Sequence, residues 1–299
     1  MKLQTLVTLI TEGGFALKGA GVGRINKEDI PRTVQLVSKL SGIPLSDLKP
    51  LGSVGKTPTS GDIDLAVDAN KYDVDPIHQK MVQELGEEKC ILNKGTKVAS
   101  YAFPIAGDES KGLVQVDLMY VASPSWAEFS YHSPGGASKY KGALRNILLM
   151  AVASSYHEPG TDHFEFDPDT NEITIRAGRT LDLNQGFRRI FQHRPRNKKT
   201  NAYLKTMKTI TPEQFQELFP DVDVQHGEIT IDDPKKVLLM LFGKPLRAND
   251  VSTAEQVIEL IKSSFDEQEQ DEIFKKAASR ARAVVGKMDI PPEIQDRIQ

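Results

Sequence analysis

The chain has 299 residues, of which 39% are hydrophobic and 26% are charged, and its formal net charge is −3. This composition is typical of a folded protein with one or two domains and excludes a largely disordered chain. The longest apolar runs, 147–153 and 237–242, are too short to cross a bilayer, and the single cysteine, Cys90, excludes a disulfide framework and a cysteine-cluster zinc site. We therefore expect a cytoplasmic protein on which any nucleic-acid surface is local.

The first half of the sequence alternates between helical and strand patterns. An apolar stripe at helical spacing predicts helices over 28–42, 75–86 and 138–155. Short apolar or alternating runs predict strands over 48–51, 62–67, 98–105 and 113–121. Residues 52–61 are rich in Gly, Ser, Thr and Pro, which indicates a loop. This order predicts a mixed sheet with flanking helices.

The second half has a different pattern. Residues 164–175 predict a hairpin, whereas residues 186–208 hold eight Lys or Arg and no acid. Helical patterns follow in a mainly acidic stretch, near 211–219, 234–242, 252–265 and 267–287. We expect an α/β (or α+β) protein with an N-terminal domain over residues 1–160. Residues 161–299 would form the hairpin, the basic segment and a mostly helical C-terminal domain.

Three aspartates form the strongest candidate for a chemical site. Asp62 and Asp64 are two residues apart on one predicted strand, so their side chains point to the same face. Asp117 lies between apolar residues on a second predicted strand and can supply a third carboxylate if the strands are neighbours. Neighbouring carboxylates repel one another unless they share a cation, and hard oxygen ligands suit Mg²⁺ or Mn²⁺. The pattern therefore predicts a divalent metal site.

A short turn precedes these acids and suggests a phosphate contact. A loop of eight residues, 54–61, separates Gly52-Ser53 from Asp62, and Lys56 lies in this loop. Glycine lets the backbone approach a phosphate closely, and exposed N–H groups, a hydroxyl and an ammonium group can bind its oxygens. A solvated strand face with a structural turn is the alternative reading.

The Gly52-Ser53 turn, the Asp62-Ile63-Asp64-Leu65 strand and the later Asp117 together resemble the nucleotidyltransferase superfamily. That superfamily includes DNA polymerase β, poly(A) polymerases, CCA-adding enzymes and aminoglycoside nucleotidyltransferases. The resemblance covers roughly residues 48–121 and the helix after them. It implies two Mg²⁺ ions on the three acids and a nucleoside triphosphate at Gly52 and Ser53. The order of strands and loops is also similar to that of nucleotidyltransferase-like proteins of tailed phages, which would place the chain in a host cytoplasm.

Two further groups of cations are candidates for ligand contacts. Lys139, Lys141 and Arg145 begin the helix after the third acid, and Lys141 and Arg145 share a face, which suggests a triphosphate contact or a solvated surface. The basic segment 188–208 is interleaved with aromatic residues, a composition typical of single-strand binding. Its alternatives are a flexible linker or a basic face docked on the acidic helices.

The sequence thus predicts a metal-dependent enzyme that moves a nucleoside monophosphate from an NTP such as ATP to an acceptor hydroxyl and releases pyrophosphate. Asp62, Asp64 and Asp117 would bind Mg²⁺ or Mn²⁺, and Asp117 would also assist deprotonation. Gly52, Ser53, Lys56 and Lys141 would bind the nucleotide. Three acceptors stay open: an RNA 3′ end, which the basic segment favours, a protein side chain, or a small molecule. The alternatives are a non-catalytic nucleotide-binding or structural protein with the same fold and a phosphodiesterase.

Overall fold

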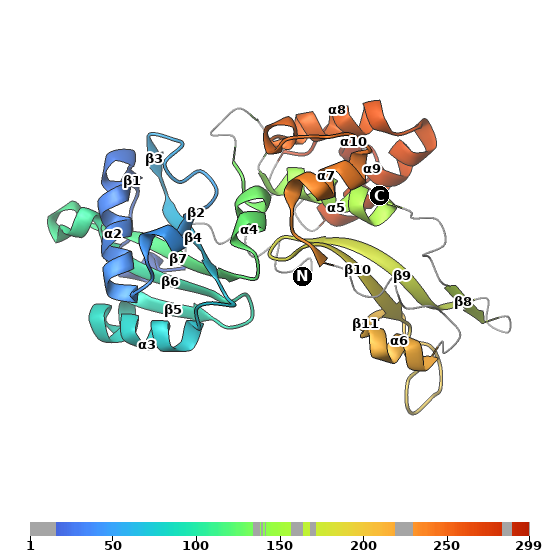
Figure 1. Ribbon diagram of the computed structural model, residues 1–299, viewed down its shortest axis with the longest axis horizontal. Helices are drawn as coiled ribbons and strands as arrows, with labels where there is room; N and C mark the ends of the chain where they lie inside the picture. Colours follow the sequence, from blue (N-terminus) through green and yellow to red (C-terminus); the bar gives the residue numbers. More distant parts are fainter. Residues whose placement is uncertain are drawn as a thin grey trace.

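The computed structural model describes residues 16–133, 138, 140, 142–156, 164–167, 172–218, 230–282 and 289–298. The chain forms two lobes that lie side by side along the long axis of the molecule (Figure 1). A short helix, α4 (Pro124–Ser130), lies between them. None of the helices in these described parts combines the length and apolar character needed to cross a membrane.

The N-terminal lobe is built on a five-stranded mixed sheet. Its strands are, in spatial order, β2 (Lys49–Pro50), β4 (Asp62–Asp68), β7 (Leu113–Val121), β6 (Val98–Pro104) and β5 (Cys90–Asn93). The two central strands, β4 and β7, are parallel, and the other pairs are antiparallel. A separate pair, β1 (Ile25–Asn26) and β3 (Thr59–Ser60), lies beside this sheet.

Alternation along β4 explains why this segment forms a central strand. Ile63, Leu65 and Val67 are fully buried on one face, whereas Asp62 and Asp64 lie on the other. The apolar face packs against α2 (Ile30–Ser41) and α3 (Val74–Leu85), whose Val37 and Met81 belong to the same core cluster. Gly42 ends α2 in the left-handed conformation, with φ of 82°. Both helices therefore cover one face and leave the acidic face to other parts of the chain.

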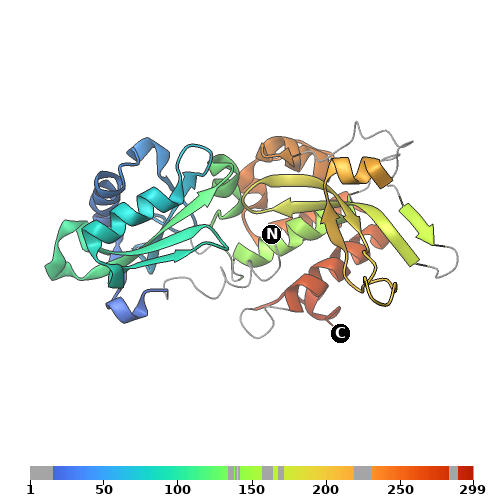
Figure 2. The same cartoon turned by 90° about the horizontal axis from the view of Figure 1, so that it is seen from below.

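The C-terminal lobe joins a second sheet to a group of helices. Its strands are β8 (Phe164–Asp167), β9 (Glu172–Asp182), β10 (Gly186–His193), β11 (Lys208–Ile210) and β12 (Thr230–Ile231). Its helices are α5 (Gly142–Ser155), α6 (Pro212–Leu218), α7 (Pro234–Phe242), α8 (Ala254–Ser264), α9 (Glu267–Ala281) and α10 (Pro292–Gln295). All its strand pairs are antiparallel, and β12 pairs with β10. Figure 2 shows this lobe beside the first, seen from below.

The predicted elements of the first half are confirmed with small shifts at their ends, and the mixed α/β class is confirmed. One of the alternatives for the basic segment 188–208, a flexible linker, is wrong for its first residues. Residues 186–193 form β10, the centre of a five-stranded sheet, and this excludes a flexible linker over these residues. The buried hydrophobic residues form two main clusters, and α5, predicted within the first domain, packs in the cluster of the C-terminal lobe.

Candidate metal and nucleotide site

The parallel pairing of β4 with β7 brings the three predicted acids together. Asp64 lies directly opposite Asp117 in the strand register, and Asp62 precedes Asp64 on the same face. One carboxylate oxygen from each of the three residues lies within 4.8 Å of those of the other two, and all three side chains are half-buried. The two strands are therefore neighbours, which is the condition for Asp117 to supply a third carboxylate.

The electrostatics of this cluster favour a cation. Burial, followed by the charges of Asp62 and Asp117, raises the pKa of Asp64 well above its usual value. A divalent ion would remove this repulsion. Opposite ligands of one Mg²⁺ are about 4.2 Å apart, twice a 2.1 Å bond, so three oxygens within 4.8 Å fit one ion or a closely spaced pair. An all-carboxylate donor set suits Mg²⁺ or Mn²⁺ better than softer metals.

A fourth side chain, Gln115, orients the third acid. Its Nε2 amide donates to both Asp117 oxygens, at 3.0 Å each, and its Oε1 accepts from the Leu17 backbone N–H at 3.2 Å. Gln115 is fully buried, so this amide has little freedom to turn. The sequence offered one clue that was not used: Gln115 stands two residues before Asp117 and shares its strand face.

The N-terminal segment 16–26 completes this arrangement. Gly23 N–H donates to the Leu113 carbonyl at 2.7 Å, and Val22 forms a bridge with Leu113 at the start of β7. Arg24 donates to the hydroxyl and the carbonyl of Thr59. These bonds attach the segment to β7 and to β3. They also hold the Leu17 N–H against Gln115.

Gly52 lies against the acids. The prediction that its backbone N–H is available to a phosphate was wrong. The N–H donates to the Tyr131 carbonyl at 3.0 Å. Its φ of +59° favours glycine, and an added Cβ would lie 3.6 Å from Asp64 Oδ2. Gly52 therefore gives close access to Asp64 and links the turn to α4. Ser53, the next residue of this turn, is half-buried.

The predicted cations have different surroundings. Lys56 Nζ donates to the Ser133 carbonyl at 3.3 Å, and partial burial lowers the Lys56 pKa. Lys56 thus joins the Gly52 loop to the segment that follows α4. Lys139 and Lys141 lie outside the described residues, so the proposed phosphate contact of Lys141 stays a prediction.

Arg145 is not on a ligand-facing surface, and that expectation was wrong. Its side chain is 1% exposed and donates to the backbone carbonyls of Phe129, Ser130 and Val251. The guanidinium carbon lies 4.5 Å from the centre of the Phe129 ring. Arg145 therefore caps the last turn of α4 and ties it to the C-terminal lobe. Its burial follows from the apolar character of α5, most of whose residues are buried.

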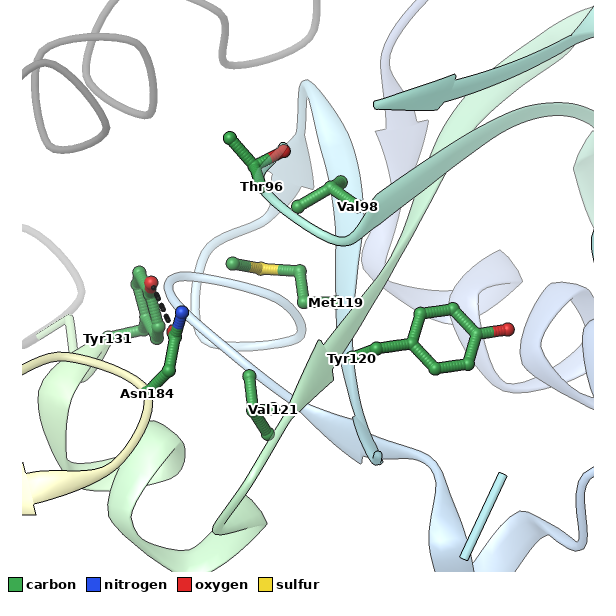
Figure 3. Close-up of a pocket in the computed structure, with 7 residues that line it drawn as sticks. All are labelled: Thr96, Val98, Met119, Tyr120, Val121, Tyr131 and Asn184. Carbon is green, nitrogen blue, oxygen red and sulfur yellow. Dashed lines mark hydrogen bonds between the residues drawn. The ribbon is translucent and has the colours of Figure 1, made fainter. Parts of the chain in front are cut away.

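The seam between the lobes lies along the same sheet face as the acids. Met119 and Val121 follow Asp117 on β7 and point toward Tyr131 and Asn184 (Figure 3). The Tyr131 hydroxyl donates to Asn184 Oδ1 at 3.0 Å, and Trp126 Nε1 donates to the Asp182 carbonyl at 2.7 Å. The cavity here has a volume of about 10 Å³, the lower limit for one water molecule. This seam therefore joins the lobes and is too small to be a substrate pocket.

The basic segment 188–208 does not join the acids. Its first part lies in β10, and its second part connects β10 to β11. β11 and α6 stand at the end of the molecule remote from β4 and β7 (Figure 1). Any role of these cations is thus separate from the carboxylate cluster.

No protein-family model, curated protein or solved structure matches this chain in the three comparisons made. The functional argument therefore depends on the geometry of the chain itself.

Proposed function

We propose that this protein is a metal-dependent nucleotidyltransferase that moves a nucleoside monophosphate from an NTP to an acceptor hydroxyl and releases pyrophosphate. The observation that carries the proposal is the convergence of Asp62, Asp64 and Asp117, from two parallel strands, within 4.8 Å. The Gly52-Ser53 turn beside Asp64 supports it, because a residue without a side chain and a hydroxyl group suit a phosphate group. The resemblance of these motifs to nucleotidyltransferases points to the same reaction.

Each side chain of the site would have a distinct role in the reaction. Asp62, Asp64 and Asp117 would hold Mg²⁺ or Mn²⁺, which when bound supplies charge stabilisation for the attacking and leaving oxygens. Asp117 is the candidate to receive the proton of the acceptor hydroxyl, because Gln115 fixes its orientation. The acceptor oxygen forms a bond to the α-phosphorus, the bond from that phosphorus to the bridging oxygen breaks, and its electron pair leaves with pyrophosphate. Ser53 would position the phosphates.

The test is transfer of label from α-labelled ATP, GTP, CTP and UTP, with Mg²⁺ or Mn²⁺. Each nucleotide is incubated with the protein alone, with mixed RNA and with a cell extract, beside the Asp64→Ala variant. We expect label on an acceptor with the unmodified chain and none with the variant. Absence of both transfer and pyrophosphate under every condition would favour a non-catalytic nucleotide-binding or structural protein with this fold.

A further inference from the structure

The connection between β10 and β11 forms an ordered hairpin, which we call the basic hairpin (residues 193–208). His193 pairs with Lys208 at its base, and Arg196 bridges Tyr203 further out. Leu204 N–H donates to the Pro195 carbonyl at 2.8 Å, and Asn197 N–H donates to the Ala202 carbonyl at 2.7 Å. The backbone therefore folds back on itself along the whole segment.

The tip of the basic hairpin is held by its own side chains. Asn197 Oδ1 accepts from the N–H groups of Lys199 and Thr200, at 2.9 and 3.3 Å. The Arg196 guanidinium lies 4.0 Å from the centre of the Tyr203 ring and donates to its hydroxyl at 2.7 Å. These contacts fix the turn, so the two lysines at the tip project from a defined position.

The charge of the basic hairpin has a single sign. Six cations and no acid lie between residues 193 and 208: Arg194, Arg196, Lys198, Lys199, Lys205 and Lys208. Five of the six are exposed, Arg194 being half-buried. The protein as a whole is slightly acidic, with a net charge of −3, so this concentration is local. A local field of this kind attracts a polyanion.

The position of the hairpin favours a long partner. Its base, β11, lies in the other lobe from β4 and β7 (Figure 1). A small acceptor bound at the carboxylates could not reach it. A flexible strand with a phosphate at every nucleotide could touch both regions.

We propose that the basic hairpin binds a single-stranded nucleic acid through its phosphodiester backbone. The exposed lysines of the hairpin contact successive phosphates of the strand. Delivery of the strand's 3′ hydroxyl to the carboxylates rests on the proposed nucleotidyl transfer, whereas the binding itself does not.

The test measures fluorescence anisotropy of a labelled 20-nucleotide uridine RNA, and of its thymidine DNA counterpart, with the full chain at several salt concentrations. The variant is Lys198→Gln with Lys199→Gln. The matched control is Lys235→Gln with Lys236→Gln, an adjacent and exposed lysine pair at the start of α7. We expect the hairpin variant to weaken binding about tenfold at 100 mM salt and to reduce the salt slope by about 1.4, or 0.7 for each lost phosphate contact. The control should match the unmodified chain.

The proposal is overturned if neither oligonucleotide binds at 50 mM salt, if both variants behave alike, or if polyglutamate displaces the strand as well as unlabelled RNA does. Comparison of the RNA and DNA arms identifies the sugar that the protein prefers. Asp64→Asn separates this proposal from the proposed function, because it should bind the strand normally while losing turnover. If the unmodified chain binds the strand but transfers no nucleotide, the hairpin proposal stands and the proposed nucleotidyltransferase activity fails.

Discussion

The two sheets of this protein differ in the charged residues that they hold side by side. On the N-terminal sheet, Asp64 and Asp117 lie side by side on parallel strands, half-buried. On the C-terminal sheet, Arg179 and Arg189 lie side by side on antiparallel strands, with exposures of only 7% and 6%. The acids are placed where they can hold a cation, whereas Arg179 and Arg189 are buried within their sheet and separate from the exposed cations of the basic hairpin.

Asp117→Asn should have the largest effect of the substitutions at the three-aspartate cluster. We expect kcat for nucleotide transfer to fall about a thousandfold, the scale of losing one preorganised charge at a reaction centre. The matched control is Asp68→Asn, at the end of β4 and outside the cluster of three acids. Steady-state pyrophosphate release measures both. Equal activity of the two variants would contradict the assignment of Asp117.

Arg145→Met tests whether a buried cation serves structure in place of catalysis. We expect the free energy of unfolding to fall by about 3 kcal/mol, because carbonyls of Phe129, Ser130 and Val251 lose a charged donor inside the protein. Urea denaturation measures this loss. The KM for NTP, measured on folded protein, should not change. A large rise in the KM for NTP with unchanged stability would contradict the structural role and indicate that Arg145 contacts the ligand.

Gln115→Met tests whether Gln115 orients Asp117, without removing any of the three acids. We expect kcat to fall about 10- to 100-fold, as for loss of a group that orients a metal ligand, because Nε2 no longer holds both Asp117 oxygens. The KM for NTP should stay within about twofold. Manganese binding, followed by electron paramagnetic resonance, should weaken in parallel. Gln115→Asn keeps an amide and should recover part of the kcat and part of the manganese affinity. Identical losses in the two variants would indicate that Gln115 serves packing only.

The smallest expected effect concerns pH and stability. The native pKa of Asp64 is raised by burial and by the other two acids, whereas the unfolded chain has a pKa of about 3.9. Above that pH the native state therefore loses stability as pH rises through the raised pKa. We expect metal-free Asp64→Asn to melt about 2–4 °C above the unmodified chain at pH 8, with little difference at pH 4. Calorimetry with and without Mg²⁺ checks this, and a difference independent of pH would contradict it.

Local patterns predicted the parts of the site that depend on one strand or one turn. The strand over 62–67 and the end of α2 depend on neighbouring residues. The apolar run around Asp117 predicted a strand, whereas its parallel pairing with β4 is visible only in the fold. The β10 strand was missed because its arginines hid an alternation in which Phe187, Arg189 and Phe191 are buried.

Contacts between distant residues explain the remaining misses. Gln115 gains its role from a bond to Leu17, 98 residues away in sequence, and Arg145 gains its role from carbonyls of α4 and of Val251. The Gly52 N–H is taken by Tyr131, which belongs to another element. No periodicity within one segment encodes such pairings, because they depend on how the lobes pack.

The most direct test of the central claim is an anomalous difference map from crystals grown with Mn²⁺ and a non-hydrolysable ATP analogue. We expect one or two manganese peaks about 2.1–2.2 Å from oxygens of Asp62, Asp64 and Asp117, with the phosphates beside Ser53. Manganese elsewhere, or a nucleotide bound away from the three aspartates, would contradict it.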